Sequence, residues 1–142
     1  MNWFTKLFKK QYQLSEEELK WNKMWDKWTE EELEQPLSSL LTYVSEIQNG
    51  GHLQFFSNLE EYGNNQLKNT LRELKKILPS EHYDNLNKAY KCYQKLDFKP
   101  VTSEDYCDVA IEEPLKEFDD FYYEYEEEIT SIMKEYSLKI EL

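Results

Sequence analysis

The 142-residue sequence has few cysteines and no long apolar run, and these absences exclude several classes of protein. Cys92 and Cys107 are too few for a disulfide scaffold and do not form a CxxC pair. No stretch approaches the roughly 18 apolar residues of a membrane span, and the N-terminus lacks the pattern of a signal peptide. The sequence therefore predicts a reduced, cytoplasmic protein.

The residue patterns of common catalytic and metal sites are also missing. His52 and His82 are far apart and neither lies in a metal-binding spacing, so each is expected on the surface or in a turn. Asp105, Asp108 and Glu112 do not follow a calcium-loop pattern, and a plain acidic loop is the favoured interpretation. There is no phosphate-binding glycine loop and no nucleophile elbow. We therefore expect no enzymatic activity, no metal and no cofactor.

The sequence is rich in aromatic residues and in helical periodicity. Four tryptophans, eleven tyrosines and seven phenylalanines argue against disorder, and the length fits one domain. Apolar residues recur at helical spacing nearly throughout, with no convincing strand pattern. We expect an all-α fold, a single compact domain of about six to seven helices with a long acidic-faced helix at the C-terminus. Residues 1–35 are expected to form a Trp-rich helical extension, and residues 36–142 the main domain.

Local signals mark the ends of the expected helices. Ser15 and Glu18 form a capping-box pattern that opens a helix to about Leu33. The tryptophans of this helix share one face and are expected to pack in the core or at a subunit contact. Residues 97–113 show no clear period and are expected to form a loop. The other expected helices cover residues 2–11, 37–47, 52–59 and 62–78, a stretch after Pro79, and a final helix from Pro114 to about Leu138.

The net charge of −12 is concentrated in the last 39 residues. Residues 104–142 carry 14 acidic and 3 basic side chains, a net of −11, whereas residues 1–103 carry a net of −1. Concentrated negative charge attracts cationic surfaces and repels nucleic acid and anionic membrane. We therefore expect a basic protein as the partner, with no direct contact to nucleic acid or membrane. A solvated face that only keeps the protein soluble is the alternative interpretation.

On a helical wheel, the expected final helix separates an apolar face from an acidic face. If residues 112–128 were one helix, they would span roughly 24 Å with about one net negative charge per 3 Å, close to the ~3.4 Å charge spacing of a DNA strand. Glu124 and residues 126–128 would lie past the first turn, where the helix dipole does not favour acids. The expected partner contacts are Glu104, Asp105, Asp108, Glu112, Glu113, Glu117, Asp120, Glu124, Glu127 and Glu128.

The most distinctive short string begins at Asn49-Gly50-Gly51 and includes Gln54, Phe55 and Asn58. Two glycines permit a tight turn between helices. Gln54 and Asn58 lie four residues apart, so their amides can share one helical face. The favoured interpretation is that these amides fix the turn by hydrogen bonds to the backbone. A small-ligand site or an enzyme built on them is the alternative.

This string, together with the acidic and aromatic segment at 115–122, resembles the DNA-mimic-protein-like family, a helical family with a Gly-Gly-x-x-Gln-Phe-Phe-x-Asn motif. The resemblance runs from about Leu37 to Tyr136. It implies an all-α fold and no catalytic residues. In the family's best-known type it also implies an acidic dimer that imitates DNA and occupies the DNA-binding surface of a transcription factor. An immunity or antitoxin protein that neutralises a basic toxin would show the same electrostatics, so both kinds of partner stay open.

Overall fold

The computed structural model describes residues 13–63, 65–96 and 103–142, without the side chains of 103–105. The described residues form seven α-helices and no strand, so the expected all-α fold is confirmed. The helix expected over residues 2–11 lies outside the described residues. The helices are α2 (Glu16–Thr29), α3 (Leu37–Glu61), α4 (Gln66–Ile77), α5 (Ser80–Gln94), α6 (Ser103–Ile111), α7 (Lys116–Glu124) and α8 (Glu126–Ser137).

Helix α2 begins as its capping box predicts. The backbone N–H of Glu18 donates to Ser15 Oγ (3.2 Å), and the backbone N–H of Ser15 donates to Glu18 Oε2 (2.9 Å). The helix packs against α3 and α8, and Trp28 Nε1–H donates to Thr42 Oγ1 on α3 at 3.0 Å. The tryptophan face is therefore a packing face, as expected.

Several segments differ from the expected helices, and α2 ends at Thr29 although it was expected to run to about Leu33. The helix expected over 62–78 begins only at Gln66, because Asn65 before it adopts a left-handed conformation with φ 61°. Residues 103–111 form α6, so the loop expected over 97–113 is wrong for that part.

The long helix expected at the C-terminus is interrupted at Tyr125. Its backbone (φ −112°, ψ 20°) is not helical, and it separates α7 from α8. The side chain of His82, on α5, donates from Nε2 to the Tyr125 carbonyl oxygen at 3.1 Å. A tertiary hydrogen bond therefore stabilises the break, and neither glycine nor proline marks it in the sequence.

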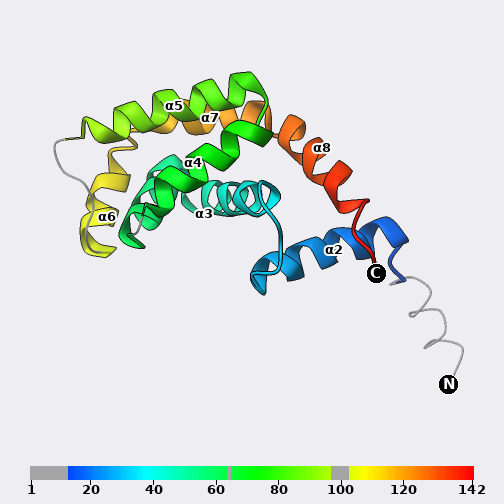
Figure 1. The fold of residues 1–142 in the computed structure, drawn as a ribbon. Coiled ribbons are helices and arrows are strands. Elements are labelled where there is room, and N and C mark those ends of the chain that lie inside the picture. Colours follow the sequence, from blue (N-terminus) through cyan, green and yellow to red (C-terminus); the bar gives the residue numbers. More distant parts are fainter. Residues whose placement is uncertain (1–12, 64, 97–102) are drawn as a thin grey trace, which may run out of the picture.

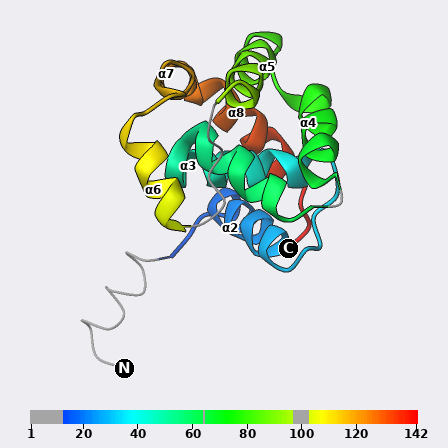
Figure 2. The ribbon, with the colours of Figure 1, turned by 90° about the vertical axis from the view of Figure 1, so that its left-hand side faces the viewer.

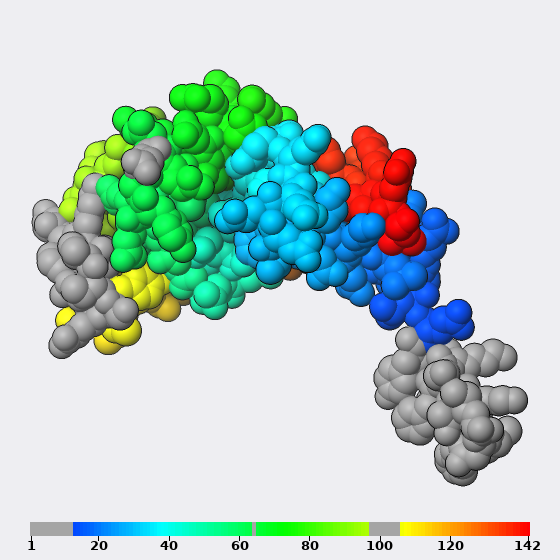
Figure 3. Space-filling model, turned by 60° about the horizontal axis from the view of Figure 1, so that its bottom comes forward, coloured from blue at the N-terminus to red at the C-terminus, as the bar shows by residue number. Residues whose placement is uncertain are grey.

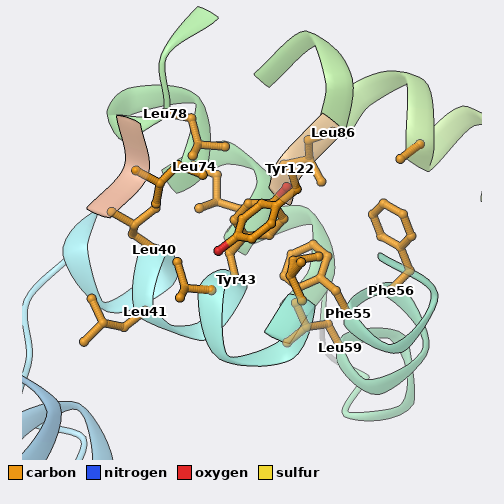
Figure 4. Packing of buried hydrophobic residues seen from close by; sticks show 14 of the residues in the cluster. Leu40, Leu41, Tyr43, Phe55, Phe56, Leu59, Leu74, Leu78, Leu86 and Tyr122 are labelled. Carbon is orange, nitrogen blue, oxygen red and sulfur yellow. The ribbon is translucent and has the colours of Figure 1, made fainter. Parts of the chain in front are cut away.

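Helix α3 lies at the centre of the fold (Figures 1 and 2). It packs against α2, α4, α5 and α7, and α7 also packs against α5. Tyr43 on α3 and Tyr122 on α7 are fully buried, with ring centroids 5.7 Å apart, among leucines and phenylalanines (Figure 4). The apolar side of α7 is thereby fixed to the core, which leaves its other side to solvent.

The molecule has the outline of an arch, with α6 near one end and α2 and the end of α8 near the other (Figure 3). Helices α6, α7 and α8 follow one another along this length (Figure 1). The acidic C-terminal third therefore extends along the molecule. No helix among the described residues is long and apolar enough to span a bilayer.

Candidate functional site

The acidic side chains expected to contact a partner are exposed wherever the structure describes them. They lie on α6, on the turn after it, on α7 and at the start of α8, while apolar side chains of α7 and α8 are buried in the core. The side chains of Glu104 and Asp105 lie outside the described residues. The acidic surface consists of the other eight, which are Asp108, Glu112, Glu113, Glu117, Asp120, Glu124, Glu127 and Glu128.

Positive charge is scarce along the acidic surface. Lys116 is the only lysine or arginine between residues 104 and 133. Its Nζ lies 2.7 Å from Asp120 Oδ2, and this hydrogen bond raises the pKa of the Lys116 ammonium. His82 Nε2 lies 3.4 Å from Glu128 Oε2, but burial lowers the pKa of His82 and favours the neutral ring. Most of the negative charge of the acidic surface is therefore open to solvent.

Because the helix is interrupted at Tyr125, the unfavourable electrostatic energy expected for these carboxylates does not apply to most of them. Residues 126–128 form the first turn of α8, where the helix dipole favours negative charge. One continuous helix would also place Glu113 near Glu117 and Glu124 near Glu128 as like-charge neighbours, but a helix boundary divides each pair. The comparison with a DNA strand also assumed one helix over 112–128, so that spacing does not hold.

Glu124 is the one carboxylate of this group whose position stays electrostatically unfavourable. It is the last residue of α7 and is exposed, so its carboxylate lies at the negative end of the helix dipole. Asp120 lies four residues before it, which adds a like-charge neighbour on the same helix. Tyr125 is both the C-cap of α7 and the N-cap of α8, so the positive end of the α8 dipole offsets part of this cost, and the like-charge pair with Asp120 remains unfavourable.

The glycine pair breaks α3, as the sequence predicts. Gly50 (φ −165°, ψ 17°) and Gly51 (φ 75°, ψ −172°) are both non-helical, and residues 52–61 form a second helical segment. A Cβ atom at Gly51 would overlap Oδ2 of Asp119, which belongs to α7. The motif therefore allows a close approach between α3 and the acidic helix.

The side-chain amides of Gln54 and Asn58 are hydrogen-bonded to a carboxylate, so the expectation that they bond to the backbone is wrong. Gln54 Nε2 and Asn58 Nδ2 both donate to Glu46 Oε2, each at 2.9 Å. The prediction that they share one face is confirmed. Both amides are therefore bonded to one side chain of α3, and their structural role stays a prediction.

The expectation that both histidines lie on the surface or in a turn is wrong, since their side chains are 0% and 1% exposed. His52 forms a hydrogen-bonded chain that the sequence pattern did not predict. Its backbone N–H and its Nδ1 both lie close to Asp119 Oδ1, at 2.8 and 2.7 Å, and its Nε2 lies 2.8 Å from the hydroxyl of Tyr43. The one signal in the sequence was a histidine within the apolar string that follows the glycines.

The direction of the protons in this chain follows from Tyr43. Burial raises the pKa of the Tyr43 hydroxyl well above its ordinary value, so it stays protonated and needs an acceptor. Its partner among the described residues is His52 Nε2, so this nitrogen accepts and Nδ1 carries the proton. Nδ1–H of His52 then donates to Asp119 Oδ1, which fixes the position of this carboxylate.

These features define a small all-α protein whose C-terminal third presents an acidic surface. Among the described residues, no group of three or more His, Cys, Asp or Glu side chains could hold a metal ion. A family model described as DMP19-like protein matches residues 26–140, and the chain belongs to this family. No curated protein and no solved structure matches the chain. The matched range begins within α2, and the division into residues 1–35 and 36–142 stays a prediction.

Proposed function

We propose that this protein binds a basic protein through the acidic surface and acts as a DNA mimic, occupying the DNA-binding surface of a regulator. The observation that carries the proposal is that all eight side chains of the acidic surface are exposed, while one lysine pairs with one of them. DNA-binding proteins hold phosphates with Arg and Lys side chains, and carboxylates can take the place of those phosphates. Membership of the DMP19-like family supports this assignment.

The position of Glu124 supports a binding role over a merely solvating one. A solvating charge can lie anywhere on the exposed surface, so nothing favours a position four residues after another acid on the same helix. Residues kept for binding are often those that are locally unfavourable for folding. By this criterion Glu124 is the first residue of the acidic surface to test.

A capture experiment with two charge-matched variants tests the proposal. The first variant, E117Q/E124Q/E127Q, removes three charges from the acidic surface. The second, E30Q/E32Q/E34Q, removes three exposed charges from the segment between α2 and α3. Both variants change the net charge of −12 by the same amount. We expect wild type and the second variant to capture a DNA-binding protein from extract of the native cells, and the first variant to lose it.

The identity of the captured protein, and whether duplex DNA releases it, distinguish a DNA mimic from an immunity protein. Release by competing duplex DNA supports mimicry, because DNA and the protein would then occupy one surface. Capture of a toxin encoded by a neighbouring gene supports an immunity protein, which uses the same acidic surface against a different basic partner. If both variants retain every partner that wild type captures, the acidic surface is not the contact.

Dimerisation belongs to the proposal as well, because the family resemblance implies it. Sedimentation equilibrium of the purified full chain measures it directly. A mass near twice 17.3 kDa supports a dimer, and a mass near 17.3 kDa at all concentrations contradicts it.

A further inference from the structure

A small pocket lies where α3, α6 and α7 meet, beside the acidic surface. Its volume is about 150 Å³, below the ~300–1,000 Å³ of pockets that hold drug-sized ligands. Leu53, Ala110 and Pro114 supply apolar wall, and Tyr106 and Asp119 also line it. The pocket is too small for a nucleotide or a large cofactor, and its size suits the end of one side chain.

Asp119 gives this pocket a fixed and incompletely bonded carboxylate. Its Oδ1 receives both bonds from His52, which leaves Oδ2 without a hydrogen-bond donor among the described residues. The side chain is 27% exposed. Lys116 also lines the pocket, but its ammonium is bonded to Asp120. Within the described part of the chain, no lysine or arginine is therefore bonded to Asp119.

We propose that this pocket receives the guanidinium group of an arginine side chain from the basic partner, with Asp119 Oδ2 as its acceptor. The inference rests on the proposed function, and it assigns one defined contact within it. Glu113 lines the same pocket, which adds a second negative charge near the bound cation. In a DNA mimic, Asp119 would take the place of one phosphate that an arginine of the regulator binds.

The lining of the pocket favours arginine over a free cation or a neutral side chain. The apolar wall can cover the methylene groups of the arginine stem. Tyr106 lines the pocket, and aromatic rings are preferred neighbours of a planar guanidinium; its hydroxyl donates to the Gly50 carbonyl oxygen at 3.2 Å. A carboxylate fixed by a buried histidine needs no reordering when the cation arrives, which favours binding.

Titration with a small probe tests the pocket without the partner. N-acetyl-arginine amide is added to the ¹⁵N-labelled full chain at constant ionic strength, and amide chemical shifts are followed by NMR. We expect saturable shifts at residues around the pocket, such as His52 and Leu53. N-acetyl-citrulline amide has nearly the same shape without the charge, and it should give no saturable shifts there.

Three variants decide whether the pocket or the overall charge binds the probe. D119N keeps an oxygen acceptor for His52 and should weaken probe binding by about tenfold or more. A110L fills the pocket with Asp119 intact and should weaken it similarly. E117Q/E124Q/E127Q removes more charge than D119N but leaves the pocket intact, so its probe binding should stay close to wild type. Equal binding of the citrulline probe, or a loss confined to the triple variant, would overturn the inference.

The pocket and the proposed function can fail separately. If the triple variant loses the captured partner while D119N and A110L keep wild-type affinity, the pocket inference is wrong and the acidic contact stands. If the arginine probe requires Asp119 but the triple variant retains every partner, the pocket stands and the proposed function is wrong.

Discussion

Replacing Gly51 with alanine is expected to destabilise the protein strongly, for two separate reasons. Its backbone (φ 75°, ψ −172°) lies in a region that is essentially restricted to glycine. The new Cβ would also overlap Asp119 Oδ2, so the carboxylate would have to move. The same carboxylate accepts two hydrogen bonds from the buried His52, and a movement of Asp119 endangers both.

The expected loss follows from these two contributions. The backbone conformation costs a residue other than glycine roughly 1–3 kcal/mol. Loss of one hydrogen bond from a buried donor to a charged acceptor adds about 1.5–3 kcal/mol. Together they predict a loss of roughly 2.5–6 kcal/mol, which is a large part of the ~5–15 kcal/mol that stabilises a typical domain.

Urea unfolding followed by circular dichroism and tryptophan fluorescence measures this loss, and Gly63→Ala is its control. Gly63 also has a positive φ, of 69°, but no atom of the described residues beyond its chain neighbours lies within 4 Å of the position its Cβ would take. This control should lose only the conformational part, about 1–2 kcal/mol. If Gly51→Ala loses no more than Gly63→Ala, the close approach of Asp119 does not constrain the turn and the reasoning is refuted.

Three further predictions concern single side chains. Tyr43→Phe leaves buried His52 Nε2 without its donor and should cost about 1–3 kcal/mol in urea unfolding, whereas Tyr122→Phe should be nearly neutral, because the buried Tyr122 hydroxyl has no hydrogen-bond partner among the described residues. Equal losses would contradict the assigned chain. Burial lowers the pKa of His82 below its ordinary 6.5, so the folded state resists protonation, and the free energy of unfolding should fall as the pH drops below about 6.5. His82→Gln should show a smaller fall between pH 7 and 5, and an unchanged slope would count against this. Glu124→Gln should raise the free energy of unfolding by about 0.2–0.5 kcal/mol, the cost of its like-charge pair with Asp120, and still weaken capture of the partner; a fall in stability would contradict the like-charge argument.

The sequence predicted those parts of the fold that depend on local chemistry. Ser15 and Glu18 cap α2 through neighbouring atoms, and the two glycines interrupt α3 because of their own backbone freedom. The separation of apolar from acidic side chains also depends only on helical spacing, so the exposure of the acidic surface was predictable.

The parts that the sequence did not predict depend on tertiary contacts. The break at Tyr125 is stabilised by His82, which is 43 residues away in the sequence. Asp119 reaches His52 across 67 residues. On a helical wheel Asp119 is one acid among many, and only the packing of α7 on α3 distinguishes it from its neighbours. The turn motif and the acidic helix, which read as unrelated features of the sequence, meet at this one residue.

The two kinds of carboxylate should therefore contribute to different steps of binding. Exposed charges such as Glu117, Glu124 and Glu127 attract a basic partner at a distance, so their replacement should mainly lower the association rate and its dependence on salt. Asp119 is fixed within a pocket and acts only after contact, so D119N should mainly raise the dissociation rate. Surface plasmon resonance with the captured partner at two salt concentrations measures both rates. If D119N and E117Q/E124Q/E127Q change the same rate to the same extent, Asp119 acts only as one more surface charge.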